Sequence, residues 1–289
     1  MTLRRGAIGT ALAGVLCAVS CNASADRWER VTVPTLDERA GAPLVGHWMP
    51  APSAPVPSRR PALVLMHGCG GLYDRRGGLA ERMRSYAELF HGEGWHVLLL
   101  DSFSSRGVHE LCTQPRRTRS VDQSHRRDDA LGAMKWMAER DDVDPQRVAL
   151  VGWSHGGSAV LAATNRRRDL PAHAPRAPRV AVAFYPGCVA ELRLGHESSA
   201  PLLVLLGAAD DWTAPQPCMA LAERSAGGVR AVVYEGAFHG FDAVAPVRVR
   251  RDVHGGVHAG QGVHVGGDPV AREASQRELL DFLRQHLAP

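Results

Sequence analysis

The chain has 289 residues, of which 45% are hydrophobic, and its formal net charge is +4. This apolar content suffices for one large core, and α/β folds of this length often form a single domain. Arginine supplies nearly all of the positive charge, since Lys135 is the single lysine. The sequence has no basic stripe interleaved with aromatic residues, so its composition argues against a nucleic-acid-binding protein.

The first 25 residues have the pattern of an export signal. Two arginines precede an apolar stretch over residues 7–20, and small residues at 23–25 provide a cleavage site. The apolar stretch is too short for a permanent transmembrane helix, so we expect no stable membrane insertion. We predict a signal peptide at residues 1–25 and a single secreted or periplasmic domain at residues 26–289.

Four cysteines remain after removal of this signal, namely Cys69, Cys112, Cys188 and Cys218. An exported protein can form disulfides, and four cysteines allow three pairings. We favour Cys69–Cys112 and Cys188–Cys218, with four buried thiols as the alternative. A lipoprotein is the alternative to plain secretion, because the residues before Cys21 weakly resemble a lipidation box.

Strand and helix patterns alternate along the rest of the chain. We expect a β-hairpin over 30–33 and 44–48, followed by strands over 62–66, 95–100, 148–151, 180–185, 201–207 and 231–234. Helices are predicted over 79–90, 121–140, 158–165, 215–224 and 269–287. Residues 102–120 and 241–268 show no clear period and are predicted as long loops. This alternation predicts an α/β fold, with a mostly parallel sheet, helices on both faces and an N-terminal hairpin.

Ligands of such sheets bind beyond the carboxyl ends of the strands, so residues there are site candidates. Ser154 follows the central apolar run in Gly152-Trp-Ser-His-Gly156, a Gly-x-Ser-x-Gly pattern between a strand and a helix. That turn is so sharp that only glycine fits beside the serine, whose hydroxyl is pushed out above the sheet. The pattern also occurs by chance, so it needs partners elsewhere in the chain.

Asp210 and His239 are the partners that follow later strands, in the order Ser–Asp–His of this architecture. A serine hydroxyl is a weak nucleophile until an imidazole accepts its proton, and a carboxylate must orient that imidazole. Asp211, the next residue, could equally be the acid. Among the histidines after the acid, only His239 directly follows a predicted strand.

Acyl transfer also needs backbone N–H donors for the oxyanion. We assign this role to His155, which follows the serine, and to Cys69 in the glycine-rich loop at residues 67–71. A nucleophilic role for the Cys69 thiol is disfavoured, because a disulfide would consume the sulfur. The later histidines match no closed zinc pattern, so we predict neither a metal nor a cofactor.

Four motifs together resemble the α/β-hydrolase superfamily, and specifically the dienelactone hydrolase family. They are His67-Gly-Cys-Gly70, Gly152-Trp-Ser-His-Gly-Gly157, Gly207-Ala-Ala-Asp210 and Ala237-Phe-His-Gly-Phe241. The resemblance covers roughly residues 44–288. It implies hydrolysis of a small-molecule ester or lactone through an acyl-enzyme, without metal or cofactor.

The chain departs from the best-known members of this family at two points. They use a cysteine nucleophile where this chain has Ser154, and they grip a substrate carboxylate with two arginines. Arg106 is a match for one of these arginines, whereas Ala243 occupies the position of the other. Trp153, beside the nucleophile, is a further candidate for substrate contact.

We therefore predict a monomeric, exported serine hydrolase that cleaves carboxylic esters or lactones. One rival is a peptidase that resembles prolyl oligopeptidases, which share the Gly-x-Ser-x-Gly-Gly pattern. The other rival is an inactive binding protein on a hydrolase scaffold.

Overall fold

The protein was analysed as a computed structural model that describes residues 2, 28–53, 58–225, 227–258 and 260–289. Apart from residue 2, the predicted signal peptide lies outside the described residues. No helix in the described ranges is long and apolar enough to cross a membrane.

Eight strands form one sheet, in the spatial order β1-β2-β4-β3-β5-β6-β7-β8. They are β1 (Glu29–Val33), β2 (Leu44–Met49), β3 (Arg60–Met66), β4 (His96–Asp101), β5 (Val143–Trp153), β6 (Val180–Phe184), β7 (Leu202–Gly207) and β8 (Val229–Tyr234). β1 and β2 pair antiparallel and form the predicted hairpin, and β2 also runs antiparallel to β4. Every other pair in this sheet is parallel.

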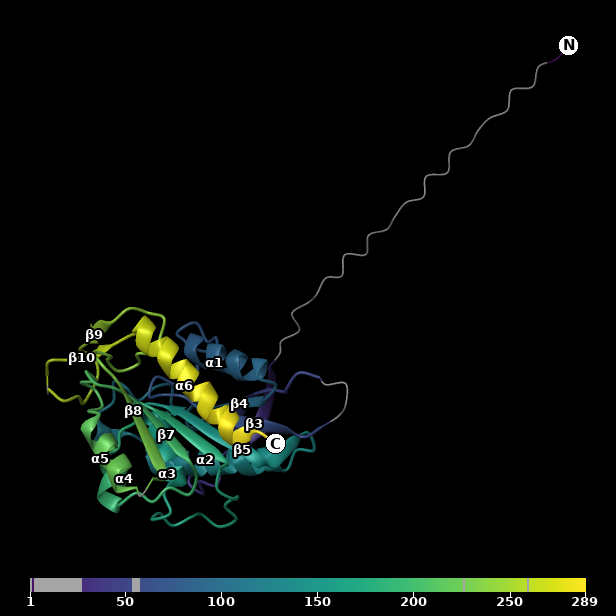
Figure 1. Cartoon of the computed structure of the whole chain (residues 1–289), viewed down its shortest axis with the longest axis horizontal. Coiled ribbons are helices and arrows are strands. Elements are labelled where there is room, and N and C mark those ends of the chain that lie inside the picture. The colour runs from purple at the N-terminus through teal and green to yellow at the C-terminus, as the bar shows by residue number, and fades with distance from the viewer. Residues whose placement is uncertain (1, 3–27, 54–57, 226, 259) are drawn as a thin grey trace.

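Helices cover both faces of the sheet (Figure 1). They are α1 (Glu81–Gly92), α2 (Gln123–Ala138), α3 (His155–Thr164), α4 (Val189–Leu194), α5 (Gln216–Arg224) and α6 (Pro269–Leu287). α1 and α6 pack their apolar side chains on one face, and α2, α3 and α5 pack theirs on the other. Because β4, β6 and β7 are covered on both faces, every residue in these strands is buried, as the continuous apolar runs indicate.

The direction of strand addition changes at the middle of the sheet. After β3 the chain adds β4 on one side of β3, and it then returns to place β5 on the other side. Such a switch point opens a crevice at the carboxyl ends of the two strands. The loop after β3 and the serine after β5 therefore meet at this crevice, on an α/β-hydrolase fold.

Five short pieces of secondary structure were not expected from the sequence. The predicted loop over 241–268 contains a small antiparallel pair, β9 (Arg248–Arg250) with β10 (Val263–Val265). The loop over 102–120 contains two 3₁₀ turns, η1 (Ser104–Arg106) and η2 (Arg116–Thr118). α4 was not predicted. Strands of three residues and a helix of six are too short for a hydrophobic period to show.

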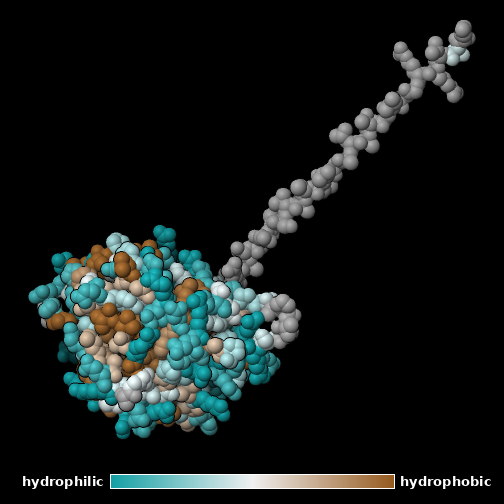
Figure 2. Space-filling view, in the orientation of Figure 1, coloured by the Kyte–Doolittle hydropathy of each residue, from teal (hydrophilic) through white to brown (hydrophobic). Residues whose placement is uncertain are grey.

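Hydrophilic residues cover most of the face shown in Figure 2, with apolar patches over the start of α6 and over β8. Val270 at the start of α6 is 79% exposed, and Val233 on β8 is 39% exposed. These valines lie outside the lining of the crevice.

Candidate active site

Ser154 occupies a sharp turn between β5 and α3. Its φ of 53° is in the left-handed region, where a residue with a side chain is strained. A Cβ on Gly156 would lie 2.1 Å from the carbonyl oxygen of Met66, and one on Gly152 would lie 2.4 Å from the carbonyl oxygen of Gly156. Only glycine fits at these two positions, which is the steric reason for the Gly-x-Ser-x-Gly pattern.

The structure brings Ser154, His239 and Asp210 together from three strand ends. His239 Nε2 lies 3.0 Å from Ser154 Oγ, and His239 Nδ1 lies 2.8 Å from Asp210 Oδ2. His239 and Asp210 are only 3% and 4% exposed. In this arrangement Nδ1–H donates to the carboxylate, which leaves Nε2 free to accept the serine proton.

Thr213 is a contact of Asp210 that the sequence-based prediction did not include. Its hydroxyl lies 2.9 Å from Asp210 Oδ2 and 3.1 Å from the Tyr185 carbonyl oxygen. Its backbone N–H donates to Asp210 Oδ1 at 2.8 Å, as does that of Trp212 at 2.9 Å. Hydrogen bonds to both oxygens therefore hold the Asp210 carboxylate in place. A Thr three residues after an Asp is a local capping pattern that could have suggested this contact.

Asp211 does not face His239. Its Oδ2 lies 2.7 Å from Nδ1 of His264, and its Oδ1 accepts the backbone N–H of His264 at 2.8 Å. Asp211 thus fastens β10 to the loop after β7. Of the two adjacent aspartates considered from the sequence, the structure orients Asp210 toward His239.

The loop at residues 67–71 lies against the nucleophile, since a Cβ on Gly68 would be 3.7 Å from that of Ser154. His67 Nδ1 lies 2.8 Å from the Gly68 carbonyl oxygen, and its Nε2 accepts the Ser102 N–H at 3.3 Å. Burial, and then the Arg126 cation, lower the pKa of His67 well below its usual value, so the ring is neutral. A neutral His67 therefore fixes the carbonyl of the peptide whose N–H belongs to Cys69.

Arg126, in the first turn of α2, is a buried cation beside His155, one of the two predicted oxyanion donors. Its Nη1 lies 3.1 Å from Nδ1 of His155, and its guanidinium carbon lies 5.0 Å from the centroid of the Phe103 ring. Burial lowers the pKa of Arg126 to about 10, and it remains protonated at neutral pH. Burial and this cation lower the pKa of His155 well below its usual value. His155 is therefore neutral, with Nδ1 accepting the arginine proton.

The four cysteines pair as expected. Cys69 bonds Cys112 and Cys188 bonds Cys218, each with a Cα–Cα distance of 5.1 Å. Cys69 and Cys188 both line the crevice. Each disulfide therefore joins a wall of the crevice to a separate segment of the chain.

The crevice is a cavity of about 690 Å³ that contains Ser154 and His155 in its lining. The other lining residues include two arginines and an apolar group, namely Arg116, Arg119, Val189, Ala190, Trp212, Pro217 and Val257. Neither Arg116 nor Arg119 forms an ion pair in the described part of the chain, and Arg119 Nε donates to the Gln114 carbonyl oxygen at 3.1 Å. Both arginines come from the 102–120 loop, in which the sequence-based prediction assigned only Arg106 to substrate contact. In the described segments no group of three His, Cys, Asp or Glu side chains could hold a metal ion.

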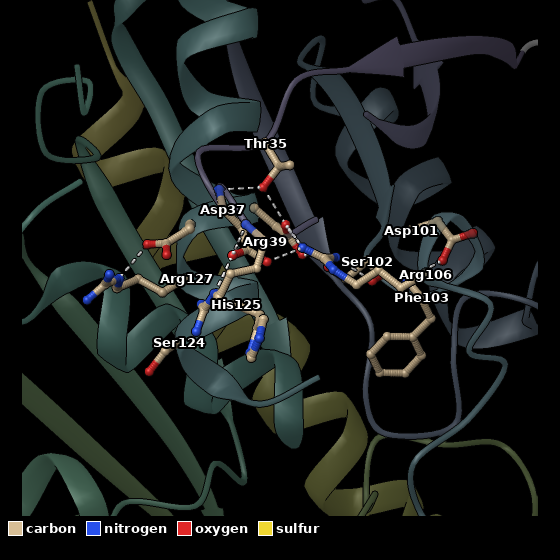
Figure 3. Close-up of polar contacts among 12 residues, drawn as sticks. Thr35, Asp37, Arg39, Asp101, Ser102, Phe103, Arg106, Ser124, His125 and Arg127 are labelled. Carbon is tan, nitrogen blue, oxygen red and sulfur yellow. Dashed lines mark hydrogen bonds and ion pairs between the residues drawn. The ribbon is translucent and has the colours of Figure 1, made fainter. Parts of the chain in front are cut away.

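The structure does not bring Arg106 to the crevice, which corrects its assignment to substrate binding. Its guanidinium pairs at 2.8 Å with Asp37 (Figure 3). It also pairs at 2.8 Å with Asp129, and the Arg106 side chain is 9% exposed. Asp37 lies between β1 and β2, so this partner could not be identified from the loop sequence alone. Arg106 links the hairpin, the 102–120 loop and α2.

The assignment of Trp153 to substrate contact is corrected as well. Its side chain is 1% exposed, and its ring is stacked on that of Phe184, with 5.4 Å between centroids. Its Nε1–H donates to Asp242 at 2.9 Å. Trp153 therefore lies behind the nucleophile and not in the cavity.

A parallel sheet whose central strand ends in a serine turn facing a histidine is the architecture of α/β-hydrolases. The sequence model of the dienelactone hydrolase family matches residues 50–287. The chain belongs to this family and is a carboxylic ester hydrolase.

Solved structures of similar fold include two hydrolases. Esterase 2 of Thermogutta terrifontis has a TM-score of 0.63 at 20% identity, over 91% of this chain and 95% of that one. The dienelactone hydrolase-like promiscuous phosphotriesterase P91 from metagenomic libraries has a TM-score of 0.62 at 18% identity, over 90% of this chain and 99% of that one.

One curated relative is similar over a shorter stretch. The quorum-quenching protein AidA of Acinetobacter baumannii (strain MDR-ZJ06) is 33% identical over 118 residues. These residues make up 41% of this chain, and the match spans 35% of the length of AidA.

Proposed function

We propose that Ser154, His239 and Asp210 are the catalytic triad of a serine hydrolase that cleaves small-molecule carboxylic esters or lactones through an acyl-enzyme. The observation that carries this proposal is the chain of hydrogen bonds from Ser154 through His239 to Asp210, at 3.0 and 2.8 Å. A serine and a histidine at this separation satisfy the geometric requirement for a nucleophile with its general base.

In the first half of the reaction Ser154 attacks the ester carbonyl while His239 accepts its proton. The N–H groups of Cys69 and His155 stabilise the oxyanion, and such a donor contributes about 10²–10³ in rate. His239 then gives its proton to the departing alcohol. In the second half water attacks the acyl-enzyme, His239 accepts a proton from that water, and Ser154 leaves with a proton from His239.

The test is to measure hydrolysis of short p-nitrophenyl esters and labelling by a fluorophosphonate probe. We expect Ser154→Ala to abolish both while circular dichroism stays unchanged. Ser275→Ala, a change of a buried serine in α6, is the matched control and should keep both. Wild-type hydrolysis of an amide at a rate similar to the ester would favour a peptidase, and an unlabelled wild type would favour an inactive scaffold.

We also propose that the mature protein is exported and monomeric. The two cysteine pairs support export, because disulfides persist in oxidising compartments. Mass spectrometry of the protein recovered outside the cytoplasm should find an N-terminus after residue 25. Light scattering of that protein should give the mass of one chain.

A further inference from the structure

A second buried polar cluster lies behind the proposed triad. At its centre is Asp242, which is 4% exposed and follows His239 by three residues. Its Oδ1 accepts the Tyr185 hydroxyl proton at 2.6 Å, and its Oδ2 accepts the Trp153 Nε1–H at 2.9 Å. Arg82 Nε from α1 lies 3.2 Å from the same Oδ2. This buried carboxylate therefore accepts two hydrogen bonds from the core and faces the Arg82 cation.

Two of the three partners of Asp242, Trp153 and Tyr185, are next to members of the proposed triad. Trp153 directly precedes Ser154 in the chain. The ring of Tyr185 packs against that of His239, with 4.6 Å between their centroids. The Tyr185 carbonyl oxygen lies 3.1 Å from the hydroxyl of Thr213, which in turn contacts Asp210. The cluster therefore contacts the turn that carries Ser154, the ring of His239, and Thr213, which holds Asp210.

Tyr185 is held in a conformation that it would not adopt by itself. Its φ is 37°, in the left-handed region that a residue with an aromatic side chain rarely enters. Its N–H donates to the Leu205 carbonyl oxygen at 2.7 Å, so the backbone, the carbonyl and the hydroxyl are all fixed. Burial raises the pKa of Tyr185 well above its usual value, so the phenol stays protonated and donates. Strain of this kind persists only where the surroundings determine the conformation.

We propose that Asp242 is a positioning residue for ester hydrolysis, which holds His239 in line with Ser154 through Tyr185 and Trp153. This inference rests on the proposed function of the triad. Hydrogen bonds to a charged carboxylate are about twice as strong as neutral ones, so one aspartate can hold two segments 89 and 57 residues away in sequence. Arg82 balances the buried charge.

The first variant is Tyr185→Phe, which removes one oxygen atom and keeps the ring against His239. We expect kcat for a p-nitrophenyl ester to fall about tenfold with KM unchanged, because small displacements of catalytic groups lower rates steeply. Tyr234→Phe is the matched control, since its hydroxyl is also buried but has no hydrogen-bond partner among the described residues. The control should keep the wild-type kcat.

The second arm tests whether Tyr185 and Trp153 act through the same carboxylate. We expect Trp153→Phe to lower kcat as well, and the double variant with Tyr185→Phe to lose less than the product of the two single losses. Asp242→Asn should resemble the double variant. All rates are compared well below the denaturation midpoint of each variant, so that a loss of stability does not appear as a loss of rate.

A third arm does not need turnover. The proton between His239 Nδ1 and Asp210 is observed by NMR in the resting protein, and its resonance should shift in Tyr185→Phe but not in Tyr234→Phe. An inactive wild type would refute the proposed function and leave this spectroscopic comparison intact. Wild-type kcat in Tyr185→Phe and Asp242→Asn, or an unmoved resonance, would overturn the role of Asp242.

Discussion

Two adjacent aspartates hold two different histidines in this protein. Asp210 contacts His239, whereas Asp211 contacts His264 in β10. Successive residues after a strand point in different directions, so neighbours with the same chemistry receive different tasks. Only the carboxylate that reaches the ring of His239 can orient it and stabilise its cation.

Asp210→Asn should lower kcat by about 10⁴, because an amide can donate to Nδ1 and hold His239 in the wrong tautomer. Asp211→Asn is the natural control, since the change is identical and one residue away. The measurement is kcat for a p-nitrophenyl ester in both variants. Equal losses would contradict the division of roles between the two aspartates.

For single residues, the sequence predicts roles that depend on a place just after a strand. It does not predict roles that depend on contacts with residues far away in the sequence. Ser154, Asp210 and His239, the proposed triad, were predicted because each follows a strand pattern. The role of Asp242 depends on a partner 89 residues away, and Arg106 was misassigned because its partner Asp37 lies 69 residues upstream. Such pairings are decided by tertiary packing, which no local pattern records.

At the scale of elements, η2 supplies a basic wall to the cavity. Arg116 belongs to this turn, Arg119 follows it, and both line the cavity without a carboxylate partner in the described segments. Arg119 is partly buried and Arg116 is exposed, and a partly buried cation attracts an anion more strongly than a fully solvated one. This wall therefore suits an ester that carries a negative charge.

Replacing Arg116 and Arg119 together by glutamine should raise KM for an ester with a carboxylate on its acyl chain. KM for the methyl-capped, neutral analogue of the same ester should stay as in the wild type. The pair of substrates is the control, because both have the same reacting carbonyl. An equal rise in KM for both esters would show that Arg116 and Arg119 affect the shape of the cavity and do not bind the substrate carboxylate.

Long elements were predictable and short ones were not. The apolar runs of β3 to β7 marked the buried strands, and Asp268-Pro269 marked the start of α6. Asp268 accepts the N–H groups of Val270 and Ala271 at 2.9 Å, as an N-cap does. α4, β9 and β10 have no such signals, since their conformations are imposed by the segments against which they pack.

At the scale of the whole molecule, two disulfides close loops of 43 and 30 residues. Each should stabilise the folded protein by about 2–4 kcal/mol, chiefly by restricting the unfolded chain. Urea unfolding with and without reductant measures this difference. The oxidised, unfolded protein should show no titratable thiol, and four titratable thiols would contradict both pairings.

The ion pairs of Arg106 determine how far this protein can be trimmed. The family match begins at residue 50, yet Asp37 lies before it and supplies one of the two carboxylates around Arg106, whose side chain is 9% exposed. A chain shortened to residues 50–287 would lose β1 and β2, expose the edge of β4 and leave this cation with Asp129 alone. For recombinant work, and for any graft of the catalytic unit into another protein, the smallest independent piece therefore begins at the hairpin and not at the family boundary.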